Sequence, residues 1–214
     1  MQDKILTLIA KLPVAFYLTG GTALSRGYLN HRYSDDLDFF ANALPEFKIQ
    51  VNTVLDFFSL EKINFKRGTF SETFVRVFVQ GIDLTLKIDF VNDVAYHYGP
   101  IQATNVYYRT DNPWNILANK LSALPRNEAR DLADLLYLCR GYKFDWEEMI
   151  SIAQKKDAWV DPIKISRIVA NFHVSEMHSL KWIKKPDYDQ MELDLKRIAE
   201  DLLKGGENSV AVTG

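Results

Sequence analysis

The sequence has little cysteine, no long apolar run and no excess of either charge. Its one cysteine, Cys139, cannot form an internal disulfide bond, which excludes a disulfide-stapled scaffold. No stretch reaches the roughly 18 apolar residues of a membrane helix, and the amino terminus lacks the apolar run of a signal peptide. We therefore expect a cytoplasmic protein that does not enter a membrane.

The charge balance excludes a global attraction to nucleic acid. The chain has 26 basic and 28 acidic side chains and a formal charge of -2, so no basic field recruits DNA or RNA. We expect no DNA binding, and any RNA contact has to be local. The 214 residues, 47% hydrophobic and 25% charged, are typical of a globular protein with one domain and a helical extension, or with two small domains.

The first half of the chain mixes helical and extended patterns. Apolar residues at helical spacing predict helices over 3–12, 22–30 and 46–58. Extended patterns predict strands over 15–19, 36–40, 62–67, 73–80 and 82–91, the last two forming an antiparallel hairpin through a tight turn at Gln80-Gly81.

From about residue 111 the patterns are helical only. They predict helices over 113–124, 127–140, 145–156, 161–177 and 188–203, with caps at Asp145 and Asp161 and a frayed tail over 207–214. The fold class is thus α/β (α+β): a mixed sheet with flanking helices over 1–110, followed by an all-α half over 111–206.

The strongest chemical pattern is the acidic segment at 35–38. On a strand, Asp36 and Asp38 point to the same face, whereas Asp35 has the wrong parity to join them. Two carboxylates this close repel each other unless a cation lies between them, and Mg²⁺ prefers such oxygen ligands. Taken alone, the segment fits a solvated turn equally well.

A second strand offers a third carboxylate. The stretch 82–90 alternates strictly, with Ile82, Leu84, Leu86, Ile88 and Phe90 on one face and Asp83, Thr85, Lys87 and Asp89 on the other. If this strand neighbours the first, Asp89 comes alongside Asp36 and Asp38. Three such carboxylates can hold two metal ions that act on a triphosphate. The alternative is an edge strand with scattered charges.

A glycine turn supplies the remaining part of a phosphoryl-transfer site. Gly20 and Gly21 precede the predicted helix at 22–30, where free backbone N–H groups attract phosphate oxygens, and Thr22 and Ser25 can add hydroxyl contacts. A Gly-Gly pair by itself is most often a tight turn. Followed by a short helix and Asp-x-Asp on a strand, it is far more specific.

These residues resemble the nucleotidyltransferase fold, and within it the AbiEii/AbiGii toxin family of abortive-infection and toxin–antitoxin systems. YLTGGTAL at 17–24, continued by RYSDDLDFF at 32–40, looks like the first motif of that family, and LKIDF at 86–90 is similar to its third-carboxylate strand. The helical segment 120–134 resembles its lysine, arginine and aspartate motif. The chain departs from the usual pattern at Arg130, where lysine is frequent, and at Gly21, where many polymerase-like members carry serine.

The resemblance implies a role for each matching position. Asp36, Asp38 and Asp89 would bind the catalytic metals, two Mg²⁺ ions with Mn²⁺ as a substitute, and Asp89 would accept the proton of the attacking hydroxyl. The nucleoside triphosphate (NTP) would contact Gly20, Gly21, Thr22, Ser25 and Lys120, with accessory roles for Lys87, Arg130 and Asp131. Arg130 and Asp131 fit surface pairing on a helix equally well.

The predicted function is the metal-dependent transfer of a nucleoside monophosphate from an NTP to an acceptor hydroxyl. By resemblance, the chain is the toxin of a toxin–antitoxin pair that acts on RNA, with the tRNA 3′ end as the acceptor by analogy and an antitoxin protein as a partner. A first alternative is a small-molecule adenylyltransferase of the antibiotic-modifying type. A second is a non-catalytic module that binds a nucleotide or a partner.

Overall fold

The computed structural model describes residues 1–211, and the chain divides into two compact units. The first contains residues 1–27 and 34–112, and the second contains residues 28–33 and the chain from Pro113 onward. The division after Asn112 lies close to the boundary predicted after residue 110. The inclusion of residues 28–33 in the second unit was not predicted, because no local pattern distinguishes them.

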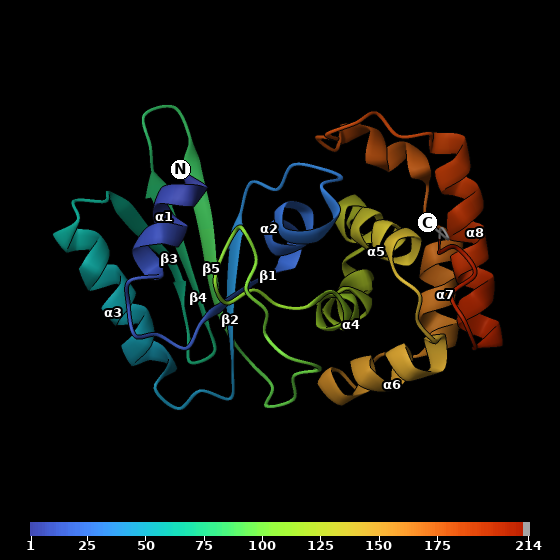
Figure 1. Ribbon diagram of the computed structural model, residues 1–214, viewed down its shortest axis with the longest axis horizontal. Coiled ribbons are helices and arrows are strands. Elements are labelled where there is room, and N and C mark those ends of the chain that lie inside the picture. The colour runs from blue at the N-terminus through green and yellow to red at the C-terminus, as the bar shows by residue number, and fades with distance from the viewer. Residues whose placement is uncertain (212–214) are drawn as a thin grey trace. The chain divides into compact units, whose positions relative to one another are not determined.

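The first unit is built on a five-stranded mixed sheet, as predicted (Figure 1). Its order is β1-β2-β5-β4-β3. The central pair β2–β5 is parallel and the other neighbours are antiparallel. The strands are β1 (Tyr17–Thr19), β2 (Leu37–Asn42), β3 (Phe65–Phe70), β4 (Phe74–Gln80) and β5 (Thr85–Asp93).

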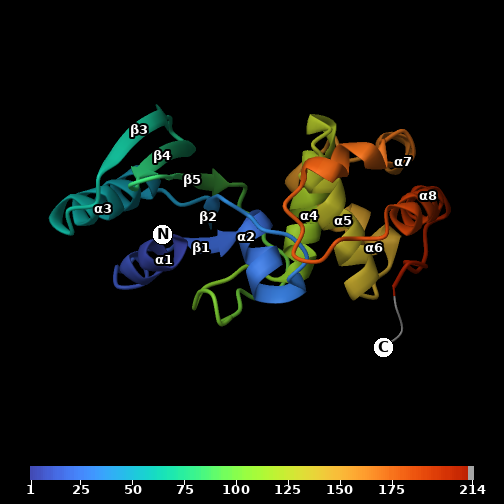
Figure 2. The ribbon, with the colours of Figure 1, turned by 90° about the horizontal axis from the view of Figure 1, so that it is seen from above.

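Helices cover one side of this sheet. Both α1 (Gln2–Ile9) and α3 (Phe47–Leu60) lie against it on the same side (Figures 1 and 2). A third helix, α2 (Gly20–Leu24), follows β1 directly and continues into a π-helical turn at Ser25–Leu29. One face of α3 is buried through Phe47, Val51, Val54, Leu55 and Phe58, and the Phe39 and Phe90 rings stack 5.6 Å apart in the same core. This burial fixes which face of each strand is covered.

The opposite face of β2, β4 and β5 carries the polar residues. In β2, Leu37 and Phe39 are buried, whereas Asp38 and Phe40, which alternate with them, are half-buried, because alternate side chains point to opposite faces. The alternation begins later than predicted in the last strand, since residues 81–84 form the hairpin turn and Ile82 is fully exposed. A hydrogen bond from the Gly81 N–H to the Leu84 carbonyl closes this turn.

The second unit is helical. It contains α4 (Pro113–Ala123), a 3₁₀ turn (Leu124–Arg126), α5 (Ala129–Gly141), α6 (Trp146–Lys156), α7 (Pro162–Ala170), a 3₁₀ helix (Val174–Ser179) and α8 (Tyr188–Lys204). The predicted caps Asp145 and Asp161 are confirmed, each accepting a backbone N–H three residues on. None of the helices within residues 1–211 is both long and apolar enough to cross a bilayer.

Two expectations for this unit are corrected. The predicted helix over 161–177 ends at Ala170, because the Asn171 side chain bonds to the Arg167 carbonyl and interrupts the helix. The predicted frayed tail is packed over its described part, since the Asn208 amide donates to the Cys139 and Tyr142 carbonyls and Val210 is buried. Residues 212–214 lie outside the described residues.

Candidate active site

A row of polar residues crosses four strands of the sheet. Thr19 on β1 pairs with Asp38 on β2, Asp38 pairs with Asp89 on β5, and Asp89 pairs with Arg76 on β4. Paired residues on neighbouring strands lie about 4.8 Å apart and point to the same face. The sheet therefore places the two carboxylates side by side on the face opposite α3.

The glycine turn lies directly against this row. Gly20 begins α2 with φ +67°, and a Cβ placed on it would lie 2.3 Å from Oδ2 of Asp38. Only glycine combines this backbone conformation with room for the carboxylate. Gly20 of the predicted phosphate turn and the carboxylate of Asp38 are thus packed directly against each other.

Replacing Gly20 with alanine should therefore damage both stability and activity. The left-handed backbone and the clash together should lower the free energy of unfolding by about 1–3 kcal/mol, and displacement of Asp38 should lower nucleotide transfer at least about tenfold. Gly206→Ala is the matched control, because Gly206 also has a positive φ of +80° but a Cβ placed on it would meet no atom of residues 1–211 within 4 Å. Equal loss of transfer in both variants would contradict the role of the Gly20–Asp38 contact.

Two cations hold the acidic groups in place. The Arg76 guanidinium donates from Nε to Oδ1 of Asp89 and from Nη2 to Oδ2, both at 2.7 Å. The Lys87 Nζ lies 2.6 Å from Oδ2 of Asp36. Hydrogen bonding to Asp89 is the main cause that raises the pKa of Arg76, with smaller contributions from Asp36 and Asp38. All three predicted metal ligands therefore stabilise the positive charge of this guanidinium.

The donor set suits a divalent metal, but its arrangement differs from the expected convergence. Asp36 and Asp38 are half-buried and Asp89 is 7% exposed, which suits oxygen ligands for Mg²⁺ at a surface site. Within residues 1–211, however, no group of three His, Cys, Asp or Glu side chains is arranged to hold an ion. Instead, Arg76 engages both oxygens of Asp89, and Lys87 engages Oδ2 of Asp36.

The two predicted hydroxyl contacts are buried. Thr22 and Ser25 are 0% and 1% exposed, and the Thr22 hydroxyl donates to the Asp36 carbonyl. The Thr22 hydroxyl thus fixes the backbone that carries the first carboxylate. A phosphate contact by Thr22, Ser25 or Gly21 stays a prediction.

Lys120 lies in the helical unit at the centre of a buried ionic cluster. Its Nζ is 2.7 Å from Oδ1 of Asp131 and 2.6 Å from Oδ2 of Asp134. Burial acts to lower the pKa of Lys120, but Asp134 and Asp131 outweigh it and raise the pKa, so the lysine stays charged. Its contact with triphosphate stays a prediction.

Asp134 is the anion on which this cluster depends. It is 0% exposed and accepts hydrogen bonds from Nε and Nη2 of Arg32 at 2.7 and 2.8 Å. Nε2 of His31 lies 2.9 Å from Oδ1 of Asp134, which assigns the proton to Nε2. At the exposed start of α5, Arg130 pairs with Glu128 at 2.7 Å.

Sequence reasoning missed four polar residues around the row. Arg76 was detectable, because β4 alternates and places it on the polar face. Thr19, Asp111 and His97 form a chain in which Asp111 accepts the Thr19 hydroxyl at 2.6 Å and lies 3.0 Å from the His97 ring nitrogen. No local pattern joins residues 92 positions apart, so only the tertiary structure identifies this chain.

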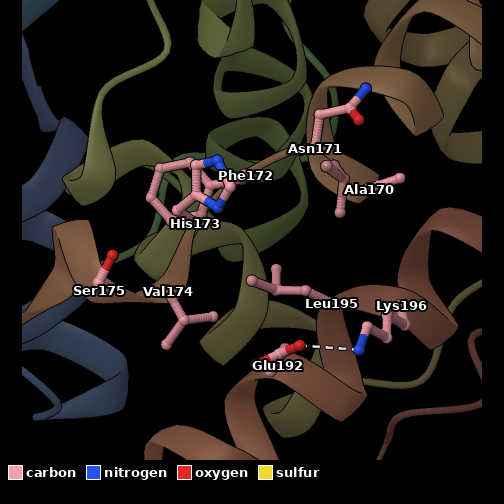
Figure 3. A pocket seen from close by; sticks show the side chains of 10 residues that line it. Ala170, Asn171, Phe172, His173, Val174, Ser175, Glu192, Leu195 and Lys196 are labelled. Carbon is pink, nitrogen blue, oxygen red and sulfur yellow. Dashed lines mark hydrogen bonds and ion pairs between the residues drawn. The ribbon is translucent and has the colours of Figure 1, made fainter.

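A separate cavity of about 470 Å³ lies in the helical unit, between the 170–175 segment and α8 (Figure 3). Its acidic side chain, Glu192, pairs with Lys196 at 2.7 Å. It has neither a pair of carboxylates nor a glycine turn among its lining residues. The sheet row is thus the better candidate for phosphoryl-transfer chemistry.

Comparison with known structures places the fold. The chain resembles the crystal structure of JHP933 from Helicobacter pylori, with 23% identity and a TM-score of 0.61, over 95% of this chain and 90% of that one. A candidate nucleotidyltransferase from H. pylori matches with 22% identity and a TM-score of 0.63, over 95% and 93% of the two chains. No curated protein matches the sequence.

The family assignment rests on nearly the whole chain. Residues 7–208 match the model of the family described as nucleotidyl transferase AbiEii toxin, type IV toxin–antitoxin system. That match includes the glycine turn, the sheet row and the helical ionic cluster. The chain belongs to the AbiEii family of nucleotidyltransferase toxins.

Proposed function

We propose that this enzyme transfers a nucleoside monophosphate from an NTP to a hydroxyl at the 3′ end of an RNA, and that this reaction makes it toxic. The observation that carries the proposal is the register of Asp38 and Asp89 on neighbouring parallel strands, with Gly20 packed against Asp38. A sheet that presents two adjacent carboxylates beside a glycine turn is suited to metal-assisted phosphoryl transfer. The RNA acceptor rests on the family resemblance.

The residues that would hold the metal are Asp36, Asp38 and Asp89. When bound, Mg²⁺ supplies neutralisation of the triphosphate charge and activation of the reacting oxygens. The acceptor oxygen forms a bond to the α-phosphorus while the bond to the bridging oxygen breaks and pyrophosphate leaves. Asp89 is the proposed acceptor of the hydroxyl proton, and it would have to be released from Arg76 first.

The proposal is tested by measuring which class of acceptor becomes labelled when the protein is given a labelled NTP. The protein is incubated with Mg²⁺ and each α-³²P-labelled NTP, with total RNA, protein extract or aminoglycosides as acceptors. We expect label in the RNA and none after EDTA treatment. Label in the aminoglycosides alone would favour the small-molecule adenylyltransferase, and label in no pool would favour a non-catalytic binding module.

Toxicity through catalysis needs a separate test in cells. Expression of the wild-type chain should arrest growth, and Asp36→Asn at equal expression should not. Growth arrest by the Asn variant would contradict toxicity by nucleotide transfer. Co-expression of a neighbouring reading frame that encodes an antitoxin should restore growth with the wild-type chain.

A further inference from the structure

Three carboxylates and two cations lie on one polar face of the sheet. Asp89, at 9% side-chain exposure, accepts hydrogen bonds from Nε and Nη2 of Arg76, and Asp36 forms an ion pair with Lys87. Asp38 lies between them, in register with Asp89. This arrangement neutralises most of the local negative charge without a metal ion, which explains how the acidic groups remain adjacent.

The same contacts oppose metal binding. Both Asp89 oxygens face Arg76 at 2.7 Å, and a divalent ion on those oxygens would be repelled by the guanidinium at short range. A metal on these oxygens and this bidentate ion pair therefore compete with each other.

The Arg76 side chain is accessible to solvent. It is 35% exposed, so solvent can take up the guanidinium once the ion pair opens. The ring of Phe74 lies 5.2 Å from the guanidinium carbon and limits the competing orientations while the pair is closed. The Arg76–Asp89 ion pair thus has a defined geometry, and solvent can still reach the guanidinium.

We propose that Arg76 is a built-in counterion that holds Asp89 in the metal-free enzyme and is displaced when the metal binds, with Lys87 acting in the same way on Asp36. This inference rests on the proposed metal-dependent function. Arg76 is a positioning residue here, because it acts through Asp89. The consequence is that Arg76 and Lys87 occupy the carboxylates of the metal-free site. The affinity for the metal ion then depends on the free energy of displacing these two side chains.

The test measures Mn²⁺ binding to the full chain by electron paramagnetic resonance, without nucleotide. Arg76→Gln should bind Mn²⁺ about tenfold more tightly than the wild type, the factor expected for loss of one charge-assisted hydrogen-bonded pair. Arg76→Lys, which keeps the charge, should bind like the wild type. Arg67→Gln is the matched control, because it removes the same charge from β3 at a position paired with the buried Val77.

A double-mutant cycle separates exchange at Asp89 from a general charge effect. In the Asp89→Asn background, Arg76→Gln should no longer change Mn²⁺ affinity, because the competing ion pair is absent. An equal gain in both backgrounds, or unchanged or weaker Mn²⁺ binding by folded Arg76→Gln, would overturn the counterion role and leave the proposed function intact. Failure of every variant, wild type included, to bind Mn²⁺ would overturn both.

Discussion

Replacing Asp38 with asparagine is expected to reduce the rate of nucleotide transfer by about 10²–10³-fold, the size of effect seen when one preorganised electrostatic contact in an active site is removed. Asparagine has the same shape as aspartate, so it should still fit beside Gly20, where a Cβ placed on the glycine would lie 2.3 Å from Oδ2 of Asp38. The loss should therefore come from the missing charge in the row shared with Asp89. Single-turnover transfer of α-³²P label with saturating NTP measures it.

Asp35→Asn is the matched control for this prediction. Asp35 is exposed and precedes β2, on which Asp38 is half-buried. The control removes the same charge three residues away and should change the rate less than about twofold, since exposed charges are strongly screened. Similar losses in both variants would show that the overall charge of this segment, and not the position of Asp38, controls the reaction.

Replacing Asp134 with asparagine should have the largest effect on stability. It would leave Lys120 and Arg32, two cations in a buried cluster, without their shared counterion. Breaking such a buried pair costs about 3–5 kcal/mol. Urea unfolding followed by circular dichroism should show this loss for the helical unit.

Asp131→Asn is the control for the cluster. Asp131 also contacts Lys120, at 2.7 Å, but Lys120 keeps Asp134 when Asp131 is changed. The cost should then be about 1–2 kcal/mol, close to that of a single hydrogen bond to a charged group. A larger loss for Asp131→Asn than for Asp134→Asn would contradict the central position of Asp134.

The ionic cluster around Asp134 predicts that the free energy of unfolding depends on pH in the acid range. Burial acts to raise the pKa of Asp134, but Lys120, His31 and Arg32 together hold it well below its usual range. Because this pKa is lower in the folded than in the unfolded chain, the carboxylate stabilises the fold above the ordinary Asp pKa of about 3.9, and this contribution is lost as the pH falls below it. Asp134→Asn should remove that part of the acid sensitivity.

Several features of this protein follow from its sequence by local rules. The alternation of β2 and β5 and the helical spacing of α3 predict which side chains are buried, because the periods of two and 3.6 residues are local properties of the backbone. The Asp caps of α6 and α7 follow for the same reason. The mixed α/β fold and the helical second half were predicted on this basis, the family was predicted from the resemblance of the sequence motifs, and all three are confirmed.

Other features depend on contacts between distant segments. The packing of Asn208 on Cys139 and Tyr142 overturned a prediction that considered only the neighbouring residues. The use of the Thr22 hydroxyl to hold the Asp36 carbonyl likewise depends on two elements meeting. No periodicity contains this information, because it lies in the packing of one element on another.

The sequence by itself placed Asp36 and Asp38 on one face of a predicted strand and Asp89 on the polar face of another, with a diglycine turn before the first strand. Only the tertiary structure decided that β2 and β5 are parallel neighbours in a register that sets Asp38 beside Asp89. It also decided that Arg76 takes both Asp89 oxygens. The physical reason is that a strand's face follows from its own alternation, whereas its partner and register follow from the burial of the whole sheet.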